Sequence, residues 1–207
     1  MNAALAEPRR LAIALGSAAL AGATDVYGYT ELVNRFVSFM SGNTSVLAIA
    51  LGRGQWRQAA VLAGIVGLFV TGAALGAGLA ALAGRRACFA VLLVVGLVLS
   101  APLVWRPLAV PAFLLSMGAL NASQTRLGGS VIGLTYVTGA LTKFGQGLGR
   151  ALFRREQEDG WRLHFFIWLS LLTGAVGAAL VQGSPETAPL WPLPCLAMAL
   201  AAAAWTL

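Results

Sequence analysis

The chain has very little charge for its length. Asp, Glu, Lys and Arg together make up 10% of its 207 residues, and hydrophobic residues make up 58%. A soluble globular domain carries about 25% charged residues, so this composition excludes a soluble protein. Uncharged apolar stretches such as 59–83 and 87–104 are long enough to cross a hydrocarbon core of roughly 30 Å. The sequence therefore predicts an all-α, polytopic helical membrane protein.

Side chains that bind metals or act as nucleophiles are also scarce. The chain has one histidine, His164, and two cysteines, Cys88 and Cys195, with no CxxC or Cys/His spacing. A lone imidazole makes a poor metal site, and a cysteine in an apolar segment usually packs as a small hydrophobic side chain. We therefore expect no metal, no cofactor and no enzymatic activity.

The positive charge of the chain lacks the pattern of a nucleic-acid-binding surface. The formal net charge is +7, but aromatic residues do not interleave with the basic ones as such a surface requires. In an apolar chain, basic residues set the orientation of the helices and contact anionic lipid headgroups. The expected partner is the lipid bilayer, and nucleic acid is not expected.

Eight apolar segments follow one another along the chain. Glycine, proline or charged residues mark most of the joins, and no join is long enough to hold a soluble domain. The first segment follows Arg9 and Arg10 and continues past the length of a signal-peptide core, so we interpret it as a membrane helix. The sequence predicts a single transmembrane domain, 1–207, with segments at about 11–29, 36–52, 59–83, 87–104, 108–126, 131–149, 163–182 and 190–207.

The two halves of the chain, about 1–105 and 106–207, share sequence blocks in the same order. Small residues recur in any membrane bundle because they let helices approach closely. Three matched blocks in one order nevertheless favour a duplication, which is common in transporters. The sequence thus predicts two internal repeats. The blocks pair Gly22-Ala23-x-Asp25 with Gly118-Ala119-x-Asn121, Ser38–Gly42 with Thr135–Gly139, and Val70–Ala73 with Leu172–Ala175.

The number of membrane crossings depends on segments 36–52 and 131–149, which are short and polar. If both cross, there are eight helices and the halves share one orientation; if both re-enter, there are six and the halves are inverted. Counting arginines on the two faces gives nine inside and four outside in both arrangements. We expect eight, because 36–52 reaches the lower span length of about 17 residues. Both arrangements place the N-terminus and loop 150–162 in the cytoplasm.

Two polar groups interrupt the apolar segments at matching places in the halves. Ionisable and amide side chains at membrane depth are costly and usually functional. Matched polar interruptions of two repeats indicate a shared site between them. We therefore predict that both groups line one cavity near the repeat axis. The candidate pathway residues are Asp25, Tyr29, Ser41, Asn43 and Thr44 in the first half, and Asn121, Gln124, Thr138 and Lys143 in the second.

Three of these features allow more than one interpretation. Asp25 is either a carboxylate that exchanges protons inside the membrane or a residue at the end of a helix. Ser41–Thr44 either breaks a helix, which frees backbone groups to face a solute, or supplies hydrogen bonds between helices. Lys143 either extends to the membrane surface, pairs with Asp25, or attracts an anionic solute.

Four ordered blocks carry a resemblance to a known family. The blocks Gly22-Ala-Thr-Asp25, Phe39-Met-Ser-Gly-Asn-Thr44, Gly118-Ala-Leu-Asn-Ala122 and Thr135-Tyr-Val-Thr-Gly139 resemble the YoaK-like family of bacterial inner-membrane proteins of unknown function. Ser41 stands where threonine is common in that family. The resemblance covers nearly the whole chain and implies a multi-pass helical fold in the bacterial cytoplasmic membrane, but it implies no substrate.

The functional hypothesis therefore rests on the polar residues. We expect a small secondary transporter for a small polar or anionic solute, with proton coupling through Asp25. A channel formed between the protomers of a homo-oligomer is the first alternative, and it needs no titratable gate. The second alternative is a membrane assembly protein without transport, in which the polar groups only hold helices together.

Overall fold

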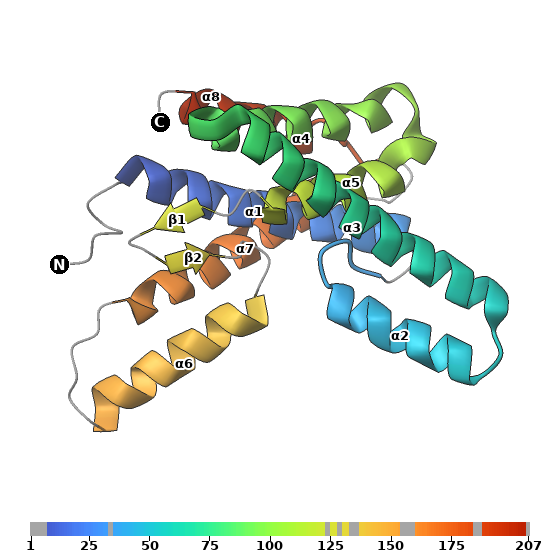
Figure 1. Cartoon of the computed structure of the whole chain (residues 1–207), viewed down its shortest axis with the longest axis horizontal. Helices are drawn as coiled ribbons and strands as arrows, with labels where there is room; N and C mark the ends of the chain where they lie inside the picture. The colour runs from blue at the N-terminus through green and yellow to red at the C-terminus, as the bar shows by residue number, and fades with distance from the viewer. Residues whose placement is uncertain are drawn as a thin grey trace.

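Helices form almost all of the described structure, a computed structural model that describes residues 8–32, 35–122, 125–127, 130–132, 137–153, 160–183 and 188–205 (Figure 1). Each predicted apolar segment contains one helix, so the all-α class is confirmed. The helices are α1 (Pro8–Glu31), α2 (Met40–Gly52), α3 (Trp56–Ala83), α4 (Ala87–Val104), α5 (Ala109–Ala122), α6 (Val137–Phe153), α7 (Trp161–Gln182) and α8 (Pro192–Ala204), with short 3₁₀ turns η1 (Gly84–Arg86) and η2 (Arg106–Leu108).

A short antiparallel hairpin lies where the sequence predicted the end of segment 108–126 and the start of segment 131–149. Strands β1 (Thr125–Leu127) and β2 (Ser130–Ile132) pair with Thr125 opposite Ile132, whereas the sequence predicted helix at 108–126 and from 131. Helix α5 ends at Ala122. β-Branched residues favour strands, and two glycines between such runs are a hairpin signal. Local turn chemistry therefore overrides the apolar pattern there.

Glycine ends two of the long helices in the same way. Gly84 follows α3 with φ of 54°, and Gly183 follows α7 with φ of 58°. A positive φ is the conformation that glycine adopts without strain and that ends a helix. Both α3 and α7 therefore end sharply at a glycine.

Two close helix crossings form the centre of the fold, where α1 packs on α7 and α3 packs on α5. Glycines allow both. A Cβ atom on Gly22 would lie 2.1 Å from the carbonyl oxygen of Leu171, and one on Gly174 would lie 2.0 Å from that of Ala19. Backbones that approach this closely are typical of small-residue interfaces between membrane helices.

The second crossing uses glycines at matching places. A Cβ atom on Gly118 would lie 2.1 Å from the carbonyl oxygen of Phe69, and one on Gly72 would lie 2.2 Å from that of Leu115. In the predicted register Gly118 corresponds to Gly22 and Gly72 to Gly174. The two crossings therefore have the same construction.

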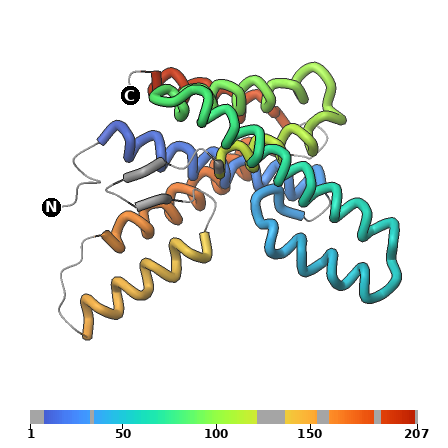
Figure 2. Tube along the Cα trace, in the orientation of Figure 1, coloured from blue at the N-terminus to red at the C-terminus, as the bar shows by residue number. Residues whose placement is uncertain are grey.

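Outside the centre, α4 packs on α8 while α2 and α6 form two arms (Figures 1 and 2). Helices α4 and α8 run antiparallel, because the ring of Phe89 lies 4.8 Å from that of Trp205 and Gly96 lies against Met198. Helix α2 packs on α3, and α6 packs on α7. In the view of Figure 1 both arms begin near the middle of the molecule and diverge toward their C-terminal ends.

Candidate functional site

Asp25 fixes the segment that leads into α2. Its Oδ1 accepts hydrogen bonds from the backbone N–H groups of Val37 (3.0 Å) and Ser38 (2.8 Å), and its Oδ2 accepts one from the Ser38 hydroxyl. Hydrogen bonds to an ionised acceptor are about twice as strong as neutral ones. The carboxylate therefore holds the residues before α2 against the last turns of α1.

Asn43 holds the same segment from within α2. Its side chain is 4% exposed, and its Nδ2 donates to the carbonyl oxygen of Phe36 at 2.9 Å. Aromatic rings also pack where α1 meets the segment before α2, because the ring centroids of Tyr29 and Phe36 are 5.0 Å apart. A Cβ atom on Gly42 would meet the ring of Phe39 at 2.5 Å. Asp25, Tyr29 and Asn43 thus belong to one corner of the fold.

The hydroxyls of α2 face outward. Ser41, Thr44 and Ser45 are exposed. Thr44 donates to the carbonyl oxygen of Met40 at 2.8 Å, and Ser45 donates to that of Ser41 at 3.1 Å. Hydroxyls bonded one turn back along their own helix do not join helices to each other. The hydroxyls of Thr44 and Ser45 therefore bond within α2, and the interpretation of Ser41–Thr44 as a source of interhelical hydrogen bonds stays a prediction.

The second polar group is divided between two helices. Asn121 on α5 donates from Nδ2 to the carbonyl oxygen of Met117 at 2.9 Å. Thr138 and Lys143 are exposed on α6, and Thr142 donates to the carbonyl oxygen of Thr138 at 2.8 Å. Gln124, which was also predicted to belong to this group, lies outside the described residues.

Among the described residues, Asp25, Tyr29 and Asn43 lie at one corner of the fold, whereas Asn121 lies on α5 and Thr138 and Lys143 lie on α6. Both oxygens of Asp25 bind the segment before α2, whereas Lys143 lies on the arm that packs against α7. The described contacts of Asp25 do not include Lys143, whose pairing with Asp25 was one of three interpretations. The prediction that one cavity joins both groups stays a prediction.

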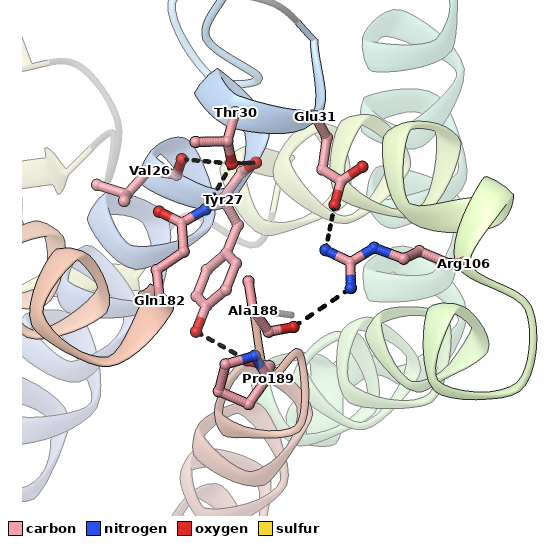
Figure 3. Close-up of polar contacts among 8 residues, drawn as sticks. All are labelled: Val26, Tyr27, Thr30, Glu31, Arg106, Gln182, Ala188 and Pro189. Atoms are coloured by element: carbon pink, nitrogen blue, oxygen red, sulfur yellow. Dashed lines mark hydrogen bonds and ion pairs between the residues drawn. The ribbon is translucent and has the colours of Figure 1, made fainter. Parts of the chain in front are cut away.

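A second polar network, which the sequence analysis missed, lies at the end of α1 (Figure 3). Glu31 pairs with Arg106 of η2 at 2.9 Å, and Arg106 also donates to the carbonyl oxygen of Ala188 at 3.5 Å. The Tyr27 hydroxyl donates to the carbonyl oxygen of Pro189 at 2.8 Å. Opposite charges at two segment ends were a visible signal, but nothing in the sequence pairs them.

The end of α7 joins the same network (Figure 3). Gln182 is 7% exposed, and its Nε2 donates to the hydroxyl of Thr30. That hydroxyl donates to the carbonyl oxygen of Tyr27 at 2.8 Å. The network therefore holds together, at one end of the molecule, elements from both halves of the chain.

Among the residues that the structure describes, no three His, Cys, Asp or Glu side chains lie close enough to hold a metal ion. Within the described ranges, three helical stretches are long and apolar enough to cross a membrane: Pro8–Glu31, Trp56–Val104 and Trp161–Gln182. The second contains α3 and α4. Length and composition thus agree with the predicted membrane class.

Comparison with known proteins decides the family. The model of the family described as "Protein of unknown function (DUF1275)" matches residues 13–203. The chain belongs to the DUF1275 family. It is also 39% identical over 199 residues to the UPF0700 transmembrane protein RA0705 of Rhizobium meliloti (strain 1021), covering 94% of this chain and 86% of that protein. No solved structure matches.

The DUF1275 match confirms the predicted resemblance to a membrane family of unknown function. The Rhizobium relative is named a transmembrane protein, and the apolar helices agree with that name. This DUF1275 member is therefore a helical transmembrane protein.

Proposed function

We propose that this protein is a small transporter that moves a small polar or anionic solute across the bacterial inner membrane, with α2 and α6 as paired half-helices of the pathway. The observation that carries the proposal is a pair of exposed hydroxyl stripes, one on each arm. Ser41 and Ser45 form the stripe on α2, and Thr138 and Thr142 form the stripe on α6. Polar side chains at membrane depth usually face a pathway or a cavity.

The placement of the two arms supports this role. Helix α2 has 13 residues and α6 has 17, so they extend roughly 20 Å and 25 Å. Helices α5 and α8 have only 14 and 13 residues, so the position of α2 and α6, rather than their length, distinguishes the two arms. Their N-terminal ends lie toward the middle of the molecule in Figure 1. Transporters use such half-helices, whose positive N-terminal ends attract anionic groups of a solute.

Contacts at both ends of the molecule support six crossings rather than eight. Eight crossings would place Glu31 and Arg106 on opposite faces, yet these residues form an ion pair. Eight crossings would also separate Arg86 from the C-terminal end, yet its guanidinium lies 4.5 Å from the ring centroid of Trp205. Six crossings place each pair on one face. We therefore favour re-entrant arms, which were the alternative expectation.

The matched crossings support a duplication of the chain. Gly22 and Gly118 meet the backbones of Leu171 and Phe69, and the repeat register relates these contacts to each other. With six crossings the two halves have opposite orientations, as in many inverted-repeat transporters.

Asp25 has a positioning role in this proposal. Three donors already bind its carboxylate, so the re-entrant segment depends on it whether or not it exchanges protons. Asp25→Asn separates the two roles. An amide oxygen can accept both N–H bonds, and the amide nitrogen can donate to the Ser38 hydroxyl. The substitution therefore removes the charge and keeps the anchor.

The proposal is tested by flux into proteoliposomes, measured for a panel of small polar and anionic solutes. We expect the double variant Ser45→Ala/Thr142→Val to lower the flux of the transported solute strongly without lowering the unfolding temperature. The matched control is Thr71→Val, because Thr71 is exposed on α3 and makes the same bond one turn back, to Gly67 at 2.9 Å. Equal flux in the double variant and the wild type would contradict the pathway.

The same flux assay tests proton coupling and the channel alternative. If coupling passes through Asp25, Asp25→Asn keeps its fold and its flux no longer varies with pH. Full, pH-dependent flux in this variant would exclude proton coupling through Asp25. Flux that rises linearly with solute concentration would favour the channel, since a transporter saturates.

A further inference from the structure

An open pocket lies between the segment before α2 and the first turns of α3. Its volume is about 480 Å³, and Arg35, Gln55, Trp56, Arg57, Gln58 and Val61 line it. The pocket thus combines two cations and two amides with an indole ring, in a chain that is otherwise poor in charge.

The two guanidinium groups of this pocket have unused hydrogen-bond donors. Within the described ranges, neither Arg35 nor Arg57 makes a hydrogen bond or an ion pair through its side chain. The acids that the structure describes are bound elsewhere, Asp25 to the segment before α2 and Glu31 to Arg106. A guanidinium presents five donors in a planar fork that matches a phosphate or carboxylate group.

The side of the membrane adds a second argument. In the proposed six-crossing arrangement, Arg35 and Arg57 face the periplasm, where basic residues are depleted in membrane proteins. Arg106, on the same face, is paired with Glu31. Two unpaired cations that line one pocket on this face indicate a function rather than a role in orientation. This argument rests on the proposed function, whereas the pocket and its unpaired cations do not.

We propose that Arg35 and Arg57 bind a phosphate-type oxyanion in this pocket, with the Gln55 and Gln58 amides as further donors. The anion is either a free oxyanion that approaches the α2 arm or the phosphodiester of a lipid headgroup beside Trp56. Guanidinium–phosphate pairs form two parallel, charge-assisted hydrogen bonds. Two cations in one recess also raise the local concentration of anions.

Calorimetric titration of the full-length protein in neutral detergent with inorganic phosphate tests the free-anion form. We expect saturable binding that Arg35→Gln and Arg57→Gln each weaken by about ten-fold, and that Arg57→Lys weakens less because lysine keeps the charge but not the fork. Arg53→Gln is the matched control, since Arg53 is exposed, carries the same charge and does not line the pocket.

Native mass spectrometry from nanodiscs tests the lipid form. Discs of phosphatidylcholine with added phosphatidylglycerol should yield a retained phosphatidylglycerol that the double variant Arg35→Gln/Arg57→Gln loses and Arg53→Gln keeps. Binding of neither probe to the wild type, or equal binding in the double variant, overturns the proposal. A protein that binds either probe at these arginines but moves no solute contradicts only the proposed function.

Discussion

Asp25 and Asn121 hold equivalent places in the two halves, and their described hydrogen bonds differ. The Asp25 carboxylate reaches backbone groups 12 and 13 residues further along the chain, whereas Asn121 bonds the carbonyl oxygen of Met117 one turn earlier in its own helix. A carboxylate only accepts hydrogen bonds, while an amide also donates. The N–H groups of a helix interior are already bonded within the helix, so Asp25 needs donors from elsewhere. The Asp25 carboxylate thus anchors the arm of the first half.

The clearest way to test the comparison is to ask whether the halves face opposite ways. Gln55 comes directly before α3 in the first half, and Gln157 belongs to the segment 150–162 that precedes α7 in the sequence of the second half. In a background with Cys88 and Cys195 replaced by serine, single cysteines are placed at these two positions. With inverted halves, a membrane-impermeant thiol reagent labels Gln55→Cys from the periplasm and Gln157→Cys only after the inner face is opened. Labelling of both cysteines only from the cytoplasmic side would support the arrangement with eight crossings.

The matched crossings should respond alike to an added methyl group. Gly22→Ala and Gly118→Ala each place a Cβ atom 2.1 Å from a backbone oxygen. Overpacking typically costs 1–3 kcal/mol, and here the neighbour is backbone, so we expect about 3 kcal/mol or more. Unfolding temperature in detergent measures the loss.

Gly67→Ala is the control for these substitutions. Gly67 lies inside α3 with open space around its Cβ position, so alanine there should be neutral or should stabilise by up to about 1 kcal/mol. A large loss at Gly22 with none at Gly118 would mean that the two crossings are not equivalent.

The anchors of the two halves should differ in strength. Asp25→Ala leaves the N–H groups of Val37 and Ser38 without their acceptor, and we expect a loss of about 2 kcal/mol. Asn121→Ala removes the hydrogen bond from the Asn121 side chain to the carbonyl oxygen of Met117, and we expect this loss to cost about 1 kcal/mol. Protease cleavage between α1 and α2 should also rise in Asp25→Ala, with Asp25→Asn close to the wild type. Equal losses at both positions would remove the distinction.

The smallest expected effect belongs to the Glu31–Arg106 pair. The side chains of Arg106 and Glu31 are 37% and 23% exposed, and ion pairs in contact with solvent contribute only about 0–1 kcal/mol. A double-mutant cycle with Glu31→Gln and Arg106→Gln should give a coupling in that range that falls at high salt. A coupling of several kcal/mol that salt does not change would mean that water does not reach the Glu31–Arg106 pair.

Much of the fold was predictable because membrane helices follow local rules. A backbone in lipid must satisfy its own hydrogen bonds, so a long apolar segment becomes a helix, and all eight segments contain one. The hairpin at 125–132 was not predicted because β-branched residues and glycines there interrupt an apolar pattern. The sequence analysis selected Asp25 and Asn43 because their polar groups interrupt apolar segments at matching places in the two halves. It missed Glu31, Arg106 and Gln182, whose partners lie 75 or more residues away.

The sequence by itself determined that this is a helical membrane protein, where its helices lie, and which polar residues interrupt them, because hydropathy and helix formation depend on neighbouring residues. Only the tertiary structure decided that Asp25 binds the segment before α2, that Glu31 meets Arg106, and that the unpaired Arg35 and Arg57 share a pocket. These contacts depend on the path of the chain between distant residues, and that path follows from how closely α1 and α7, and α3 and α5, can pack.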